Sequence, residues 1–310
     1  MKKYVILADS ACDLSQELRD QFGVVDYVQG HVHFSDGRDF HTTLDWSNIG
    51  RDELYKALSN KKFEASTSPA SPEEYYLAFK KYAEQGFDII SMSLSSKISS
   101  THAVSKSAAK RIKEEHPDCN IYCFDTYKMS GAFGLLVIYA HSLKNEGKSF
   151  DEVVAWLEAS KHKVHQMGPI DDLFFVARRG RITMGKAIMG SFAGVKPMGD
   201  CTREGYASVL AKVKGINKAL DITVKYIERV AVDVKAQYIL ISHSNRLEYA
   251  EKLKSMIEEK LNPKQVFVCD IFTCCASNIG PGMIGAYFLG EEISEDLVVE
   301  KDIMTELING

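Results

Sequence analysis

Short apolar runs alternate with longer segments of helical periodicity through the first half of the chain. The expected strands cover residues 4–9, 87–94 and 121–125. The expected helices cover residues 14–22, 48–58, 73–85, 102–116 and 131–145, followed by one that carries Trp156. Strands that alternate with helices of this length indicate a parallel sheet with helices on both faces. In such sheets, ligands bind beyond the carboxyl ends of the strands.

Two of these helices begin with a complete capping signature. Ser71 stands at the position of an N-cap, Pro72 follows at the first helical position, and Glu74 can reach back to the N-cap backbone. Ser149 and Glu152 have the same spacing ahead of the next predicted helix. Both helix starts are therefore predicted from local chemistry alone.

The pattern changes after about residue 166, where Gly168-Pro169 interrupts the chain and glycines become frequent. The expected strands here are 206–213, 238–242 and 266–272, and the expected helices are 171–179, 217–230, 246–261 and 294–307. We interpret this half as a second, smaller α/β domain with a mixed sheet. The predicted fold is thus α/β with two domains, residues 1–165 and 166–310.

Composition narrows the class of protein. The chain has 310 residues, of which 45% are hydrophobic and 26% charged, as in an ordinary globular protein. Its net charge of −4 and the lack of a basic helical stripe argue against nucleic-acid binding. The apolar run at residues 4–8 is too short for a signal peptide, and no stretch approaches the ~20 apolar residues of a membrane span. We expect a cytoplasmic protein without stable membrane insertion.

No metal site is predicted. The seven cysteines contain no CxxC pair, which a structural zinc site favours, and small buried cysteines are the expected interpretation. His31 and His33 alternate on one predicted strand face, and His162 and His165 are spaced as one helical turn, so each pair could chelate. Neither pair has a convincing third ligand nearby, and we expect solvated histidines.

A hydroxyl-rich segment, residues 95–101, precedes the predicted helix that begins near His102. Ser99, Ser100 and Thr101 would lie at its amino end, where free backbone N–H groups and the helix dipole favour an anion. A single N-cap would need only one of the five hydroxyls. The motif GxxxxGK[ST] is absent and no GxGxxG follows the first strand, so a carboxylate is favoured over a nucleotide phosphate.

Large apolar side chains surround this segment in the sequence, and most are expected to be core. Met184, Ile188 and Phe192 fall at helical spacing with Gly185, Gly190 and Gly194 among them. Small residues beside large ones leave room for an apolar ligand between the domains. Periodicity alone does not decide between core and ligand site.

Six motifs in order resemble the DegV family of bacterial fatty-acid-binding proteins. They are Ala8-Asp9-Ser10-Ala11-Cys12-Asp13-Leu14, Thr67-Ser68, residues 95–101, Asp171-Asp172-Leu173 with Arg179-Gly180-Arg181-Ile182, Val195-Lys196-Pro197, and Gly280-Pro281-Gly282. The resemblance runs from end to end. It implies a two-domain carrier that holds one long-chain fatty acid in a tunnel and presents the carboxylate to a separate fatty acid kinase, for phospholipid synthesis.

The resemblance also implies site residues. Thr67 or Ser68, together with Ser99, would hydrogen-bond the carboxylate, assisted by the backbone N–H of Ser100. Asn278 stands where the family usually has histidine, so that position can donate a hydrogen bond but carries no positive charge. Ser100 stands where the family usually has glycine, so either its φ is negative or the backbone there is strained.

Arg178, Arg179 and Arg181, with Lys186, form a compact basic patch. A solvated surface is one interpretation, and a docking surface for the kinase is the other, because arginine suits carboxylate and phosphate contacts.

Two rival functions are weighed against the carrier. A serine hydrolase would use Ser99 as nucleophile with His102 as base, but no GxSxG elbow is present and the family histidine is Asn278 here. A regulator of degradative enzymes would need a nucleic-acid-binding surface that the sequence lacks. We therefore expect a non-enzymatic lipid carrier without catalytic residues, metal or cofactor.

Overall fold

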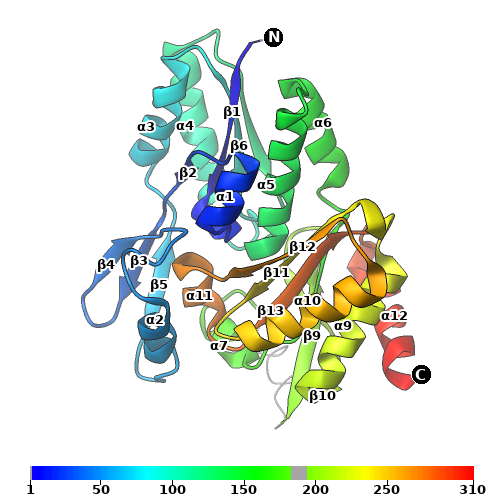
Figure 1. The fold of residues 1–310 in the computed structure, drawn as a ribbon. Helices are drawn as coiled ribbons and strands as arrows, with labels where there is room; N and C mark the ends of the chain where they lie inside the picture. The colour runs from blue at the N-terminus through cyan, green and yellow to red at the C-terminus, as the bar shows by residue number, and fades with distance from the viewer. Residues whose placement is uncertain (1, 183–193) are drawn as a thin grey trace.

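The computed structural model describes residues 2–182 and 194–310, which form an α/β architecture with two four-stranded sheets and two smaller ones (Figure 1). Sheet A has the order β2-β1-β6-β7 and is parallel throughout. Its strands are β1 (Tyr4–Asp9), β2 (Tyr27–Val28), β6 (Asp88–Ser93) and β7 (Ile121–Asp125). The expected parallel sheet is therefore confirmed.

Helices cover both faces of sheet A. On one face, Val5 and Leu7 share an apolar cluster with side chains of α3 (Pro72–Ala83) and α4 (Thr101–Glu115). On the other, Ile6 and Ala8 pack in the cluster that includes α1 (Gln16–Phe22), α5 (Ser130–Asn145) and α6 (Phe150–Ser160). Burial on both faces explains why β1 is a continuous apolar run rather than an alternating one.

Sheet C has the order β12-β11-β13-β8 and is mixed, as predicted. Its strands are β8 (Val164–Met167), β11 (Tyr238–His243), β12 (Gln265–Asp270) and β13 (Ile284–Leu289); only the β11–β12 pair is parallel. One face packs in a cluster with α9 (Ile216–Val230), α10 (Leu247–Leu261) and α12 (Val298–Asn309). The predicted domain boundary after residue 165 falls inside β8, and the division into two domains stays a prediction.

Helix α5 covers the other face of sheet C and lies between the two large sheets (Figure 1). Its almost wholly apolar sequence follows from burial on both sides. Gly131 and Gly134 permit the close approach: a Cβ at Gly131 would lie 2.2 Å from the Tyr287 ring, and one at Gly134 would lie 2.4 Å from the Cys12 carbonyl oxygen.

Two small antiparallel sheets complete the fold. Sheet B has the order β4-β3-β5, with β3 (His31–Phe34), β4 (Asp39–His41) and β5 (Ala65–Ser68). Sheet D pairs β9 (Val195–Cys201) with β10 (Ala207–Lys214). Short helices connect these parts: η1 (Ser10–Cys12), α2 (Arg51–Leu58), α7 (Leu173–Arg178), η2 (Val234–Ala236), α11 (Thr273–Ile279) and η3 (Glu295–Leu297).

Several local predictions are confirmed and several are corrected. Both capping boxes form as expected, at Ser71 and Ser149. The helix expected at 294–307 begins only at Val298, and the strand expected at 266–272 ends at Asp270. His162 and His165 do not share a helix, because α6 ends at Ser160 and His165 lies on β8.

Candidate functional site

A cavity of about 280 Å³ opens at the carboxyl ends of β1 and β6, between residues of both halves of the chain. Its polar lining consists of Asp9, Ser10, Thr67, Ser68, Ser99, Ser100, Thr101, Arg181 and Asn278. Its apolar lining includes Val28, Ala70, Tyr75, Leu94, Ile98, Met129, Val176, Ala207 and Ile279. The position beyond the strand ends is the one that the parallel sheet predicts for a ligand.

All five residues predicted to bind the ligand line this cavity. Thr67 and Ser68 end β5, Ser99 and Ser100 precede α4, and Asn278 lies on α11. Helix α11 packs against β5, which brings residues separated by about two hundred positions together. The structure thus places the five side by side, and their role as ligands stays a prediction.

Some side chains of the hydroxyl-rich segment hold the fold together, and others line the cavity. Ser95 is buried and donates its hydroxyl to the Gly205 carbonyl at 2.9 Å, which fixes the turn between β9 and β10 against this segment. Ser99 Oγ pairs with Thr101 Oγ1 at 2.7 Å and accepts the Thr101 N–H at 3.2 Å. Ser100 has φ −85°, so of the two alternatives the negative value holds and the position is unstrained.

Asn278 holds Thr67 from the opposite wall. Its side-chain amide donates to Thr67 Oγ1 at 3.0 Å and to the Cys274 carbonyl at 2.9 Å. Because the Thr67 oxygen accepts this bond, its own hydroxyl hydrogen stays available as a donor. An amide in place of the usual family histidine therefore orients the threonine but adds no charge.

Of the basic patch, Arg181 lines the cavity and Arg178 is exposed. The guanidinium carbons of Arg178 and Arg179 lie 5.6 Å and 5.2 Å from the centre of the Phe175 ring. Arg181 donates to the Arg179 carbonyl at 2.5 Å. The patch thus combines one cation at the cavity with two that stack on α7, and Lys186 lies outside the described residues.

A second cavity of about 110 Å³ adjoins the first and is almost wholly apolar. The two share four lining residues: Met129, Val176, Ala207 and Ile279. Its remaining wall includes Ile170, Leu173, Ile182, Met198, Val209, Met283 and Tyr287, from α7, sheet D and sheet C. Phe133 and Leu136 of α5 belong to the core. Met184, Ile188 and Phe192, which the sequence singled out, lie outside the described residues.

Asp9 is the acidic group of the cavity lining. Its carboxylate oxygens accept the N–H groups of Ala11 and Leu94, both at 2.8 Å. Burial raises the pKa of Asp9 to about 6, and the two backbone hydrogen bonds reduce the rise. The Asp9-Ser10 pair at the end of β1 was quoted for the family resemblance, but its place in the cavity was not predicted from the sequence.

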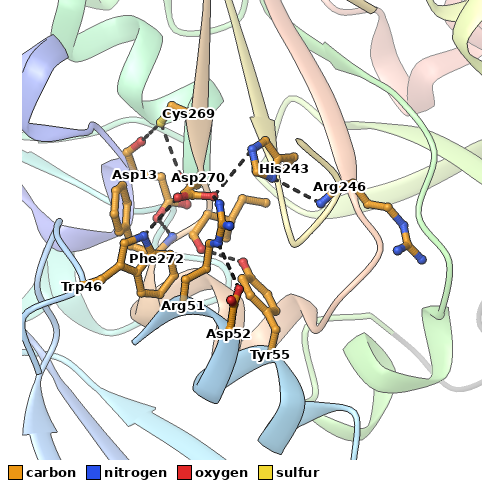
Figure 2. Close-up of polar contacts among 11 residues, drawn as sticks. Asp13, Trp46, Arg51, Asp52, Tyr55, His243, Arg246, Cys269, Asp270 and Phe272 are labelled. Atoms are coloured by element: carbon orange, nitrogen blue, oxygen red, sulfur yellow. Dashed lines mark hydrogen bonds and ion pairs between the residues drawn. The ribbon is translucent and has the colours of Figure 1, made fainter. Parts of the chain in front are cut away.

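A cluster of charged and aromatic residues holds α2 against sheet C where α11 begins (Figure 2). Asp270, at the end of β12, accepts the Trp46 indole N–H at 3.0 Å and lies 3.6 Å from the Arg51 guanidinium and 3.5 Å from His243 Nε2. Burial is the main cause that lowers the pKa of His243. These contacts join α2 and the segment before it to β12, and none of the residues lines the cavity, so we assign the cluster a structural role.

Asp13 forms the buried half of that cluster (Figure 2). Its carboxylate accepts the Phe272 N–H at 2.9 Å and the Ser130 hydroxyl at 2.6 Å, and its carbonyl accepts the Cys269 thiol at 2.6 Å. Burial raises the pKa of Asp13 to about 7, although the Ser130 and Phe272 hydrogen bonds oppose the shift. These contacts fix the start of α11 and hence the position of Asn278.

The geometry does not favour a hydrolase at Ser99. The Ser99 hydroxyl is paired with Thr101, and His102 lines a different depression, beside Lys106 and Tyr122. A nucleophilic serine needs a base within hydrogen-bond reach.

Among the described helices, none is long and apolar enough to cross a membrane.

Comparison with known proteins identifies the family. Residues 3–291 match a family model described as "Uncharacterised protein, DegV family". A DegV domain-containing protein of Clostridium perfringens is 34% identical over 294 residues, which cover 94% of this chain and 99% of that protein.

Solved structures agree with this match. A fatty-acid-binding DegV family protein of Thermus thermophilus is 25% identical with a TM-score of 0.82, covering 94% of this chain and 100% of that one. The fatty acid kinase B3 protein of Streptococcus pneumoniae, solved with linoleic acid, shares the fold at 18% identity and a TM-score of 0.80, over 93% and 100% of the two chains. The chain belongs to the DegV family.

Proposed function

We propose that this protein binds one long-chain fatty acid, with the carboxylate at Thr67, Ser68, Ser99 and Ser100 and the tail in the adjoining apolar cavity. The observation that carries the proposal is the junction of the two cavities, one rimmed by hydroxyls and the other apolar. The fatty acids bound by the Thermus thermophilus relative support the same ligand class.

The tail supplies most of the affinity. Burying ~15 methylenes at about 0.8 kcal/mol each gives roughly 12 kcal/mol before the costs of association. Side chains such as Val176 and Ile279, which line both cavities, would contact the chain where it passes from one to the other.

The head group needs donors, because a carboxylate removed from water without partners takes up a proton instead. The Thr67 hydroxyl, held by Asn278, and the hydroxyls near α4 provide them. Arg181 in the same lining adds the positive charge that Asn278 lacks.

Extraction of the purified protein followed by mass spectrometry tests the ligand class. We expect about one long-chain acid per chain. The delipidated protein should bind oleate, and Ser99→Ala and Thr67→Val should each weaken binding about tenfold, because a hydrogen bond to a charged group contributes ~1.5–3 kcal/mol.

Ser255→Ala and Thr305→Val are matched controls, since both hydroxyls bond to carbonyls of their own helices and are exposed. They should leave oleate affinity unchanged. An extract without lipid and a delipidated protein that fails to bind oleate would overturn the proposal. Turnover of a p-nitrophenyl acyl ester that Ser99→Ala abolishes would instead favour the hydrolase.

We further propose that the carrier presents the carboxylate to a fatty acid kinase, with Arg178 and Arg179 in the docking surface. The exposed Arg178 precedes the cavity-lining Arg181 by three residues, so a partner that contacts it would lie near the mouth of the head-group site. Replacing Arg178 and Arg179 by Glu should weaken the measured carrier–kinase affinity while oleate binding is retained. Unchanged kinase affinity would discard this role.

A further inference from the structure

Sheet B brings the side chains of two histidines close together on its solvent side. In the register of β3 and β4, His31 lies directly opposite His41. Their rings are 4.6 Å apart between centroids. Cross-strand partners on one face of an antiparallel pair are close enough for their side chains to act together. The histidine pair weighed from the sequence, His31 with His33, is therefore not the closest pairing.

A carboxylate from another element completes the group. Glu74, in the first turn of α3, places Oε2 2.9 Å from His31 Nε2 and Oε1 3.8 Å from His41 Nδ1. One ligand atom from each of the three residues lies within 4.8 Å of the other two. This is the third ligand that the sequence alone did not supply.

The Glu74 carboxylate is held in place by the capping box. Its Oε2 accepts the Ser71 N–H at 2.7 Å, and the Ser71 hydroxyl accepts the Glu74 N–H at 3.2 Å. Hydrogen bonds of this kind orient a metal-ligating carboxylate and are part of most metal sites. The side chains of His31, His41 and Glu74 are 27%, 54% and 33% exposed, so an ion can reach them from solvent.

We propose that His31, His41 and Glu74 form a binding site for a divalent transition metal such as Zn²⁺. Two imidazoles and one carboxylate are a ligand set that Zn²⁺ accepts, and three protein ligands leave a fourth position for water. The ion would replace the present contact between His31 and Glu74 by three metal–ligand bonds and join β3, β4 and α3.

The site is connected to the lipid cavity through β3. His31 is also the register partner of Ser68 on β5, and His33 Nε2 lies 3.3 Å from Ser68 Oγ. A metal that fixes β3 would therefore steady the strand that carries two of the predicted head-group ligands. The metal site itself does not depend on the lipid being bound.

Titration of chelator-treated full-length protein with Zn²⁺, followed by calorimetry, tests the site. We expect one ion per chain, and His31→Ala and His41→Ala should each weaken binding tenfold or more, the order of loss that accompanies damage to a metal site. His33→Gln is the matched control on the same strand face and should bind Zn²⁺ like the unmodified protein.

Titration with Co²⁺ distinguishes this site from the cysteines. The visible spectrum should show nitrogen and oxygen ligation without thiolate charge-transfer absorption, and His41→Ala should abolish it. Equal Zn²⁺ affinity in His41→Ala and the unmodified protein would overturn the proposal, as would a thiolate band. Because oleate binding is measured separately, failure of the metal site leaves the proposed lipid function standing.

Discussion

The two cavities that meet at Ala207 are built in different ways. The polar one is assembled from side chains on separate elements, held by hydrogen bonds such as those of Asn278 to Thr67 and Ser95 to Gly205. The apolar one is a gap between α7, sheet D and sheet C, lined mainly by apolar side chains. In the proposed complex, a few directed bonds would position the head group, while shape and volume would select the tail. Substitutions in the polar cavity and in the apolar cavity should therefore change ligand binding in different ways.

The largest expected effect is on the pH dependence of stability, and it comes from Asp13, which helps to hold the start of α11 behind the polar cavity. Its pKa is raised to about 7 from 3.8 by burial, so the folded state holds this proton more tightly than the unfolded chain. The free energy of unfolding therefore falls as pH rises from about 4 to about 7 and levels off above, by an amount on the order of 4 kcal/mol.

Asp13→Asn should lose this part of the pH dependence, so its stability relative to the unmodified protein should rise towards alkaline pH. Urea unfolding at several pH values measures the difference. Asp302→Asn, at an exposed position, is the control. Parallel stability profiles for Asp13→Asn and the unmodified protein would contradict the assignment.

The second effect is expected where the cavities join. Ala207→Phe places a ring at the shared wall and should weaken binding of an 18-carbon acid by about 100-fold, because overfilling a packed site costs 1–3 kcal/mol and tail contacts are also lost. Acids short enough to remain in the first cavity should lose less. Ala236→Phe, at an exposed position, serves as control; equal losses for short and long acids would remove the distinction between the two ends.

A smaller effect is expected from the cation of the polar end. Arg181→Met keeps much of the side-chain length but removes the charge, and should weaken oleate binding about tenfold. Binding of the corresponding fatty alcohol should change little, since it carries no charge. If alcohol and acid lose affinity equally, Arg181 acts by packing and not by charge.

The smallest effect is expected at Asn278. Asn278→His restores the residue that the family usually has, and a protonated imidazole near the head group should tighten oleate binding a few-fold near pH 6 relative to the unmodified protein. Near pH 8 the gain should vanish. A pH-independent affinity ratio would show that this side chain acts only through its bond to Thr67.

Local signals predicted much of the fold but little of sheet B. The capping boxes at Ser71 and Ser149 and the strand 121–125 depend on neighbouring residues, and the structure has them where they were expected. In sheet B only the strand that carries His31 and His33 was predicted, from its alternation. The strands β4 and β5 are three and four residues long and rich in polar side chains, so neither periodicity nor length marks them. The pairing of β5 with β3 depends on contacts between residues that are far apart in the sequence, so local sequence patterns do not predict it.

The same limit applies to the candidate site. The binding roles of Thr67 and Asn278 were assigned through the family resemblance, and only the packing of α11 on β5 explains their contact. Arg181 was predicted for a docking surface, which stays a prediction, and its place in the cavity lining, just after α7 and Gly180, was not predicted from the sequence. The third metal-binding side chain, Glu74, was visible in the sequence as a capping residue, but its nearness to His41 depends on tertiary structure.

The position of α5 limits how a lipid can enter. Since this helix packs against elements of both halves, swinging the two halves apart would expose the apolar face of α5 that lies on sheet C. That opening would cost a large part of the folding free energy. We expect exchange of the proposed fatty acid to occur through local displacement of the segments that line the cavity, while α5 keeps its position.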